Sequence, residues 1–414
     1  MTQLRKVAIC TPLRTPVGKF LGTLAPLEAG TLGAIILKAL VERSGVDPER
    51  VDDVIFAQGY GSGEAPAIGR WSWLAAGLPI GVPGYQVDRR CGSGLQAVIN
   101  AAMMVQTGAA DCVVAGGVES MSNVEHYTTK ARHGARMGDM VLWDRLTRGR
   151  LMSQPIERFG VISGMIETAE NLAADYEISR EASDGFAVRS HQNAAAAWDA
   201  GKFDEQLVPV DVPQRRGDPV RFDHDEGYRR DADMDSLGKL RAIEGKHNAA
   251  AVVTAGNASQ QNDAAAACLV VAEDKVEQLG LTPLLWFDGW AAAGCDPARM
   301  GIGPVPAVER LFARGGANGQ RGWDDIGLIE LNEAFAPQAL AVLKGWGFAE
   351  DDPRREIVNV NGSGISLGHP IGATGGRILA DMAHEMHRRE VRFGLETMCI
   401  GGGQGIAAIF ERAA

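Results

Sequence analysis

Two stretches of this chain alternate short apolar segments with amphipathic helical patterns, and this alternation limits the folds open to it. In the first 120 residues, apolar segments begin at residues 7, 54 and 112, and helical patterns lie between them. One helical face has apolar residues 32, 35, 36, 39 and 40, with Thr31 as its expected cap and Gly45 as its expected end. The pattern predicts an α/β fold, with helices on the faces of a mainly parallel sheet.

The same alternation returns near the C-terminus. From about residue 281, we expect a strand at Gly327–Leu331, a helical face over 378–386 and a last strand at Ile406–Phe410. Cys112–Gly117 also resembles Thr397–Gly402, since each is a strand-like run that leads into glycines. Between these stretches the chain is charged and has a helical pattern without matching strands. We predict two related halves, residues 1–120 with 262–280 and residues 281–414, and an inserted unit at 121–261.

Charge and cysteine usage exclude several classes of protein. The net charge of -11 argues against binding to nucleic acid or to an anionic membrane surface. The six cysteines are dispersed and form no C-x-x-C pair, so we expect reduced thiols and no metal site. The chain shows no signal-like segment, no apolar run of about 20 residues and no targeting address at its end, which predicts a cytoplasmic protein.

Cys91 lies in the glycine-rich run Arg90-Cys91-Gly92-Ser93-Gly94, and a helical pattern with apolar residues 95, 98, 99, 102 and 103 follows it. A cysteine at a helix start faces unpaired amides, which stabilise a thiolate, and the preceding arginines add positive charge. Cys399 follows an apolar strand and precedes three glycines. For both cysteines the alternative is a small buried hydrophobic residue, and the flanking glycines favour a reactive role for Cys91.

Two further polar residues lie in short, constrained segments. His369 is held in Gly368-His369-Pro370-Ile371-Gly372, which suits a general base or an oxyanion donor. Asn332 lies where a strand passes into a helix, so it either caps the helix or holds a water or a carbonyl group. The chain lacks the spacings of a Rossmann fingerprint, a P-loop and a serine nucleophile elbow, which argues against those cofactor and hydrolase classes.

These segments together resemble the thiolase family. The resemblance rests on Cys91-Gly92-Ser93-Gly94, Asn332-Glu333-Ala334-Phe335, Gly368-His369-Pro370-Ile371-Gly372 and Cys399-Ile400-Gly401-Gly402-Gly403, in that order, and it spans nearly the whole chain. It implies a thiolase fold, with two βαβαβαββ halves packed as five αβαβα layers and a loop domain inserted in the first half. It also implies a homodimer or homotetramer.

The resemblance implies an acetyl-CoA C-acyltransferase, or β-ketothiolase, that works through an acyl-cysteine. Cys91 would be the nucleophile, His369 its activator, and Cys399 the group that exchanges a proton with acetyl-CoA. One oxyanion hole would come from His369 and a water held by Asn332, the other from the backbone amides of Cys91 and Gly401. Coenzyme A, acetyl-CoA and acyl-CoA would be substrates, with no permanently bound cofactor.

By the same resemblance, a set of residues would contact coenzyme A and the acyl group. They are Arg229, Ser236, Leu240, Ala255, Ser259, Ala334, Phe335 and Met165. Many short-chain members of the family have a histidine where this chain has Gly164, and the loop that faces coenzyme A differs at Gln260, Gln261 and Ala264. These departures leave the acyl chain open between a short group and a longer, branched or β-ketoadipyl-type group.

Two other classes stay open beside the thiolase. A decarboxylating ketoacyl synthase has the same fold, although it favours histidine or asparagine at the position of Cys399. A noncatalytic protein that binds coenzyme A or lipid would keep the scaffold without turnover. The same residues serve synthesis and degradation, so the sequence does not choose the direction of the reaction.

Overall fold

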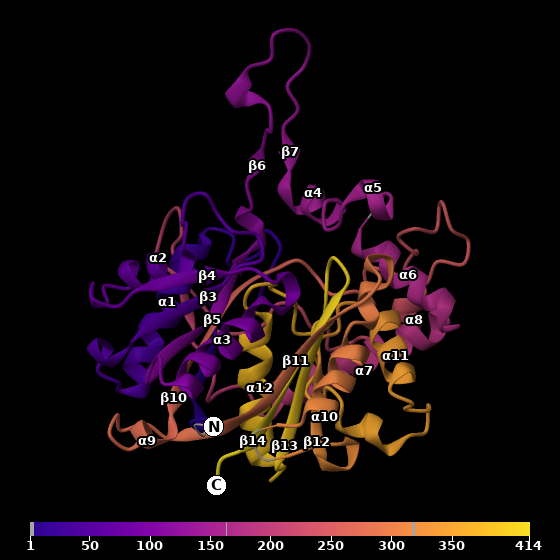
Figure 1. The fold of residues 1–414 in the computed structure, drawn as a ribbon. Coiled ribbons are helices and arrows are strands. Elements are labelled where there is room, and N and C mark those ends of the chain that lie inside the picture. Colours follow the sequence, from indigo (N-terminus) through magenta and orange to yellow (C-terminus); the bar gives the residue numbers. More distant parts are fainter. Residues whose placement is uncertain (1–3, 163, 317–318) are drawn as a thin grey trace.

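The computed structural model describes residues 4–162, 164–316 and 319–414. Within these residues the main feature is a ten-stranded sheet with the strand order β12-β13-β14-β11-β1-β10-β5-β3-β4, in which β2 also pairs with β10. Figure 1 shows this sheet with helices on both sides of it. In the same residues, no helix is both long and apolar enough to cross a membrane.

The first half of the fold supplies one end of the sheet. Its elements are β1 (Val7–Arg14), β2 (Gly18–Lys19), α1 (Ala29–Ser44), β3 (Asp53–Ala57), α2 (Ile68–Ala75), β4 (Gly84–Val87), α3 (Ser93–Thr107), β5 (Cys112–Ser120), β10 (Asn262–Ala272) and α9 (Glu273–Val276). Strand β3 is parallel to β4 and β5, whereas β10 is antiparallel to both β5 and β1.

The second half repeats this pattern. Its elements are β11 (Pro283–Gly294), α10 (Pro304–Arg314), β12 (Ile326–Leu331), α11 (Ala336–Gly345), α12 (Thr374–Arg388), β13 (Phe393–Ile400) and β14 (Gln404–Arg412). Strand β12 is parallel to β13, and β14 is antiparallel to both β13 and β11. Strands β5 and β13, whose sequences resemble each other, therefore hold equivalent places, and the prediction of two related α/β halves is confirmed.

The chain between β5 and β10 forms smaller elements above the sheet. They are β6 (His126–Tyr127), β7 (Trp143–Asp144), α4 (Arg145–Leu151), α5 (Ile156–Phe159), α6 (Met165–Asp175), α7 (Arg180–Asp199), β8 (Val210–Val212), β9 (Val220–Phe222) and α8 (Met234–Gly238). The helical pattern expected in this part of the chain corresponds to α7, and the Ser179 side chain caps it by accepting the Ala182 N–H. Figure 1 shows the β6–β7 hairpin extending away from the body of the protein.

Buried side chains on both faces of the sheet explain the layers. In β3, Val54 and Phe56 pack with α1 and α2, whereas Ile55 and Ala57 pack with α3 on the other face. Side chains of α3 and α12 share one apolar cluster with strands of both halves. A third cluster covers the outer face of the second half with α10 and α11. The order is thus helices, sheet, helices, sheet, helices, which confirms the expected five-layer arrangement.

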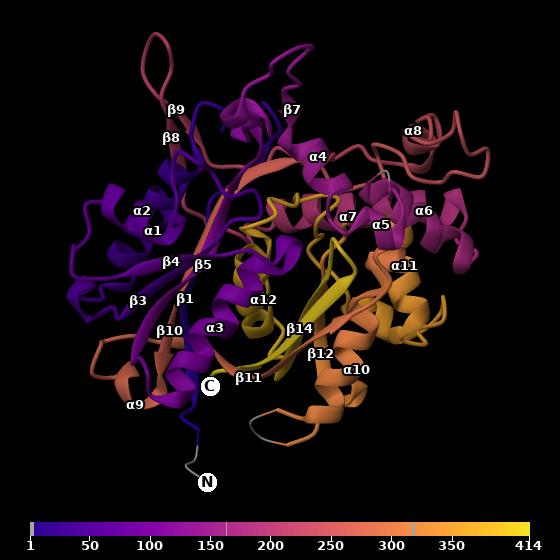
Figure 2. The same ribbon diagram turned by 45° about the horizontal axis from the view of Figure 1, so that its top comes forward.

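The two central helices touch through their first turns. A Cβ atom added at Gly375 would lie 2.1 Å from the Leu95 amide nitrogen, and one added at Gly94 would lie 2.9 Å from the Gly372 carbonyl oxygen. Only glycine permits backbones this close. Figure 2 shows α3 and α12 side by side between the strands of the two halves.

Helix α1 differs from its prediction at one end. It begins at Ala29 rather than after Thr31, and no side chain caps it. Gly30 packs its backbone against Trp71, since an added Cβ would lie 2.3 Å from the indole ring. Tertiary packing thus fixes where this helix starts. Its C-terminus is as predicted, because Gly45 adopts a left-handed conformation with φ of 69°.

Helix α12 buries charged residues as well as its predicted apolar face, because both sheet halves cover it. The Arg377 Nη1 donates to Asp381 Oδ2 at 2.7 Å, and Arg14 of β1 donates to the other Asp381 oxygen at 3.2 Å. Arg14 also holds Asp225 at 2.9 and 3.1 Å. All four side chains are at most 2% exposed. This network ties the central helix to β1 and to the segment that precedes β10.

Removing one member of this network should destabilise the fold. Arg14→Met leaves the buried carboxylate of Asp225 without its cation and removes one of the two cations that pair with Asp381, for which we expect a loss of about 3–5 kcal/mol. The control is Lys38→Met, because Lys38 and Glu42 are 3.9 Å apart and each 64% exposed, and such pairs contribute about 0–1 kcal/mol. Urea unfolding of both variants measures the difference. Equal losses in the two variants would contradict the assigned role of the network.

Candidate active site

Cys91 lies in a short 3-10 turn, Arg90–Gly92, directly before α3. The turn is held by the Arg89 N–H, which donates to the Ser93 hydroxyl at 2.7 Å. Gly92 packs against the second half, since an added Cβ would lie 2.6 Å from the Ile400 side chain. The sequence expectation of a cysteine at a helix start is therefore met, and the helix start is pressed against β13.

Burial decides the protonation state of Cys91. It raises the pKa of the thiol, while the Gly401 N–H and the charges of Arg90 and Arg150 lower it by less. The sequence suggested that the helix start and the arginines would stabilise a thiolate. In the folded protein desolvation outweighs them, because a charged sulfur loses water in this site. The resting thiol is thus protonated, and a base is needed to activate it.

Two hydrogen bonds fix His369. Its backbone N–H donates to the Asn262 side chain at 2.8 Å, and its Nδ1 lies 2.7 Å from the Thr374 hydroxyl. That hydroxyl donates its own proton to the Pro370 carbonyl, so it accepts a proton from Nδ1. The proton of the neutral ring is therefore on Nδ1, and Nε2 is the basic atom.

The basic atom of His369 is buried and ready to bind a partner. Among the described residues, no group hydrogen-bonds to Nε2. Burial, followed by the positive charges of Arg377 and Arg150, lowers the pKa of His369 to about 3. The imidazole is therefore neutral at physiological pH, as a general base must be before it accepts a proton.

Cys399 is the second buried thiol of the site. It is the next-to-last residue of β13, opposite Gly405 of β14, and is fully buried. Burial raises its pKa well above the ordinary value, and the neighbouring thiols of Cys91 and Cys295 raise it further. The tight turn after it contains Gly402 and Gly403, with φ of 89° and 83°. Because the Gly401 N–H lowers the pKa of Cys91, this turn brings the two catalytic candidates to one place.

Asn332 does not cap a helix. Helix α11 begins at Ala336, with Phe335 at its N-cap, so the capping alternative is wrong. The Asn332 side chain is fully buried, and neither its oxygen nor its nitrogen has a hydrogen-bond partner among the described residues. A buried amide without partners costs stability. Its position suits a water or a substrate carbonyl as the missing partner.

Several residues expected near coenzyme A lie close to these groups. The Ser259 N–H donates to the Ala334 carbonyl at 2.9 Å, and Ala258 pairs with Phe335. Met165, Ala334 and Phe335 share an apolar cluster with Cys399. The Met165 sulfur lies 3.3 Å from the position of a Cβ added at Gly401. These contacts place Met165, Ala334 and Phe335 beside Cys399 and the turn that follows it.

The other expected contacts lie farther out. Leu240 packs on Gly256, next to the exposed Ala255. The Ser236 hydroxyl is used within α8, since it exchanges hydrogen bonds with the backbone of Asp233. Arg229 is exposed and, among the described residues, forms no ion pair, while its N–H donates to His191 Nδ1 at 3.2 Å.

The departures from the family pattern have clear places in the structure. Gln260 donates to the Gly227 carbonyl at 3.2 Å, so it ties the segment of Arg229 to the loop before β10. Gly164 precedes α6, and an added Cβ there would meet no atom within 4 Å. Ala264 lies in β10, opposite Glu119. Gln261 accepts the Phe20 N–H through its carbonyl.

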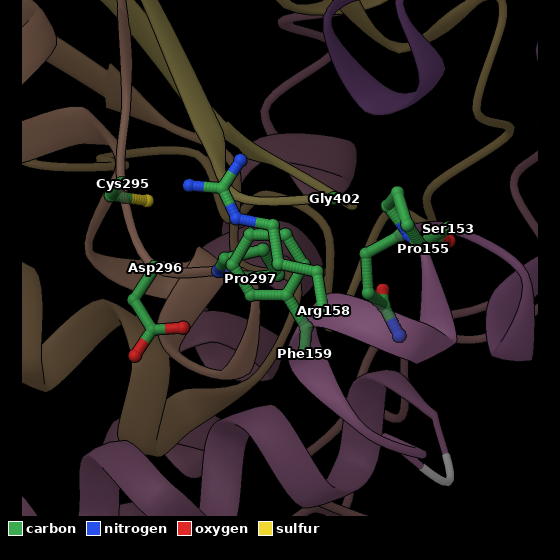
Figure 3. A pocket seen from close by; sticks show the side chains of 9 residues that line it. Ser153, Pro155, Arg158, Phe159, Cys295, Asp296, Pro297 and Gly402 are labelled. Atoms are coloured by element: carbon green, nitrogen blue, oxygen red, sulfur yellow. The ribbon is translucent and has the colours of Figure 1, made fainter.

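A cavity of about 520 Å³ lies against the turn after Cys399. Figure 3 shows Cys295 and Asp296 on one side of it and Ser153 and Pro155 on the other, with the side chains of Arg158, Phe159 and Pro297 between them. Neither Cys91 nor His369 lines this cavity. In the part of the chain that the structure describes, no group of three His, Cys, Asp or Glu residues is arranged to hold a metal ion.

Sequence reasoning missed three residues that act on the site. Thr374 and Asn262 orient His369, and Arg150 places a positive charge near Cys91 and His369. Asn262 lies 107 residues from His369 along the chain. No local pattern marks such residues, because their roles depend on contacts made only in the folded chain.

The low pKa of His369 predicts a pH effect on stability. Between its ordinary pKa of 6.5 and the folded value of about 3, the unfolded chain binds a proton that the folded protein does not. Wild type should therefore lose stability relative to His369→Asn as the pH falls from 6.5 to 4. Thermal unfolding across this range measures the difference, with His247→Asn, at an exposed position, as the control. Parallel curves for wild type and His369→Asn would contradict this assignment.

Comparison with known proteins assigns the chain to a family. The thiolase N-terminal domain family matches residues 7–274, and the thiolase C-terminal domain family matches residues 281–412. An acetyl-CoA acetyltransferase of Chromobacterium violaceum is 47% identical over 412 residues, which are 98% of this chain and 100% of that protein.

Solved structures agree with these sequence matches. The crystal structure of the Bacillus anthracis acetyl-CoA acetyltransferase is similar, with a TM-score of 0.92, 39% identity and full coverage of both chains. The human mitochondrial 3-ketoacyl-CoA thiolase in complex with CoA is similar, with a TM-score of 0.90, 36% identity and full coverage of both chains. The chain belongs to the thiolase family.

Proposed function

We propose that this protein is an acetyl-CoA C-acyltransferase, or β-ketothiolase, that works through an acyl-Cys91 intermediate. One observation carries the proposal: the Cys91 and Cys399 thiols are buried near each other, and the buried His369 Nε2 and Asn332 amide, on adjoining segments, have no hydrogen-bond partner among the described residues. The similar proteins named acetyl-CoA acetyltransferase and 3-ketoacyl-CoA thiolase support the same reaction class. In one direction it cleaves a β-ketoacyl-CoA with CoA, and in the other it condenses acyl-CoA with acetyl-CoA.

Thiolysis begins at Cys91. His369 Nε2 takes the thiol proton, and the sulfur attacks the β-keto carbonyl carbon. The bond between the α and β carbons then breaks, which leaves an acyl-Cys91 and the enolate of acetyl-CoA. Because the pKa of Cys91 is raised and that of His369 is lowered, a free thiolate-imidazolium pair is disfavoured. The proton therefore moves as the sulfur attacks.

Cys399 completes the cycle. Its raised pKa keeps it protonated, so it gives its proton to the enolate carbon and acetyl-CoA leaves. The resulting Cys399 thiolate is a strong base, and it takes the proton of an incoming CoA thiol. The CoA sulfur attacks acyl-Cys91, and the departing Cys91 sulfur recovers its proton from His369. Condensation is the same sequence reversed.

Negative charge develops on a carbonyl oxygen in each half of the cycle. The Gly401 N–H, which lowers the pKa of Cys91, and the Cys91 N–H suit the oxyanion of the acyl-cysteine step. Protonated His369 and a water held by Asn332 suit the enolate oxygen. Fixed donors in a dry site stabilise these charges strongly, because they need no reorganisation during the reaction.

We also propose that residues 121–261 hold coenzyme A, with residues 1–120, 262–280 and 281–414 forming the two catalytic halves. Arg229, exposed and without an ion pair among the described residues, suits a phosphate of the nucleotide. The other proposed coenzyme A contacts lie between Arg229 and Cys399. They are Leu240, Ala255, Ser259, Ala334 and Phe335. The Ser236 hydroxyl, already satisfied inside α8, would contribute mainly through its backbone or shape.

A larger acyl group is the second candidate substrate. The open space at Gly164, next to Met165, favours a longer, branched or β-ketoadipyl-type chain over a strict two-carbon group.

We further propose a homodimer or homotetramer in the cytoplasm. Exposed large apolar side chains support association, among them Trp71, Ile80, Met137, Val141 and Leu142.

The first test is CoA-dependent loss of acetoacetyl-CoA absorbance, followed with wild type, Cys91→Ala and Cys112→Ala. We expect Cys91→Ala to lose turnover and the acyl adduct seen by mass spectrometry, because no other thiol replaces the nucleophile. Cys112 is also buried, yet it lies at the far end of β5, so its variant should stay active. An acyl adduct formed at the normal rate in Cys91→Ala would exclude this nucleophile.

A second variant separates the two thiols. Cys399→Ala should still form the acyl-Cys91 adduct from acyl-CoA but should lose at least about 100-fold in thiolysis and condensation, since it lacks the acid-base group. Rapid-quench mass spectrometry and steady-state rates measure the two steps. Full turnover would refute the division of labour between the cysteines. Stoichiometric alkylation of wild type without any turnover would instead favour a noncatalytic binding protein.

A further inference from the structure

We propose that Glu119 is a positioning residue, whose buried carboxylate holds the His369 loop in register with Cys91. This inference rests on the proposed function, since it concerns how the same two residues meet. Glu119 is the next-to-last residue of β5 and has no exposed surface. Nothing in its local sequence indicates a ligand or a catalytic task.

The carboxylate bridges two loops that are distant in sequence. Oε2 accepts the Gly59 N–H at 2.8 Å and the Gly372 N–H at 2.9 Å, while Oε1 accepts the Tyr60 N–H at 3.2 Å. Gly59 and Tyr60 follow β3, and Gly372 ends the segment that begins with Gly368 and His369. One side chain therefore fastens the His369 loop to the edge where β3 and β5 end.

The loop that Glu119 holds also contacts the helix of Cys91. The Gly372 carbonyl oxygen would lie 2.9 Å from a Cβ at Gly94, three residues after Cys91, and 2.1 Å from a Cβ at Gly117 in β5. Any shift of Gly372 would therefore alter the packing between the two catalytic segments. The bridge sets the separation of His369 Nε2 from the Cys91 sulfur, to which the reaction rate is sensitive.

Through Tyr60, the contacts of Glu119 also extend to helix α4. The Tyr60 hydroxyl donates to the Leu146 carbonyl at 3.3 Å, and the side chains of Tyr60, Met121 and Leu146 pack together against Ile371. Helix α4, which contains Leu146, is further held by Arg90, whose guanidinium donates to the Gly149 carbonyl at 3.2 Å. Glu119 thus contacts the His369 loop directly, through Gly372, and helix α4 indirectly, through Tyr60.

The ionised form is the one that can accept all three N–H groups. Burial, and to a smaller extent the charge of Asp88, raises the pKa of Glu119 to about 7, against the three N–H donors that lower it. Among the described residues no lysine or arginine forms an ion pair with it. Replacing the carboxylate by an amide keeps the shape but puts an NH2 group against backbone N–H donors.

The test compares Glu119→Gln with wild type at pH 8, where the carboxylate form prevails. We expect kcat for acetoacetyl-CoA thiolysis and the rate of Cys91 alkylation by iodoacetamide each to fall by about 10- to 100-fold. The KM for CoA should change by less than about twofold, because the bridge touches no proposed CoA contact. Hydrogen exchange should become faster in peptides that contain residues 59–60 and 370–374.

Asp263→Asn is the matched control. Asp263 is a fully buried carboxylate on the neighbouring strand β10, and it accepts the Ser122 N–H at 3.0 Å without touching a catalytic loop. It should lose stability yet keep kcat and the exchange rates of those two peptides. If Glu119→Gln does not fold, Gly59→Ala disturbs the same bridge, since its Cβ would lie 2.4 Å from Ile371 and 3.1 Å from Glu119.

Clear outcomes would overturn the proposal. They are a kcat for Glu119→Gln within about twofold of wild type, unchanged exchange in the two peptides, or the same losses in Asp263→Asn. Inactivity of wild type toward every β-ketoacyl-CoA would refute the proposed function instead. The alkylation and exchange measurements need no substrate, so they test the bridge even in that case.

Discussion

The backbone contact between the first turns of α3 and α12 is the constraint on which the site depends. Glycines at 94 and 375 allow these helices to meet at distances that any side chain would prevent. The helix start of α3 holds Cys91, and the loop that leads into α12 holds His369. Their contact in the central layer brings together the proposed nucleophile from one half and the proposed base from the other. The five-layer packing exists around this junction, because both halves of the ten-stranded sheet bury the same pair of helices.

The electrostatics of the site follow from its depth. Burial raises the pKa of both thiols and lowers that of the imidazole, so the resting site is neutral. A neutral site is stable without bound substrate, and charge forms only as bonds change. The burial that disfavours charge in the resting site then favours the reaction. Fixed N–H groups stabilise the developing charge strongly, because little water competes with them. Two thiols with this environment suit a reversible exchange of thioesters.

Charged groups deeper in the fold hold its elements together. Arg14, Asp225, Asp381 and Arg377 form a buried network that ties α12 to β1 and to the inserted segment. Arg377 also lowers the pKa of His369. The network that holds α12 in place thus also contributes to the protonation state of His369, the proposed base, so the same residue affects both stability and reactivity.

The sequence by itself determined the fold class, the two halves and the motif residues. Period-two and helical patterns depend on local burial, which neighbours along the chain reveal, so β3, β12, α3 and α12 were predictable. Glycine-bracketed Cys91, His369 and Cys399 were visible for the same local reason. The start of α1, the capping alternative for Asn332 and the charge state of Cys91 were not, because each depends on packing. Only the tertiary structure decided that Asn262, Thr374 and Glu119 support His369, since contacts between segments up to 253 residues apart leave no pattern in either segment alone.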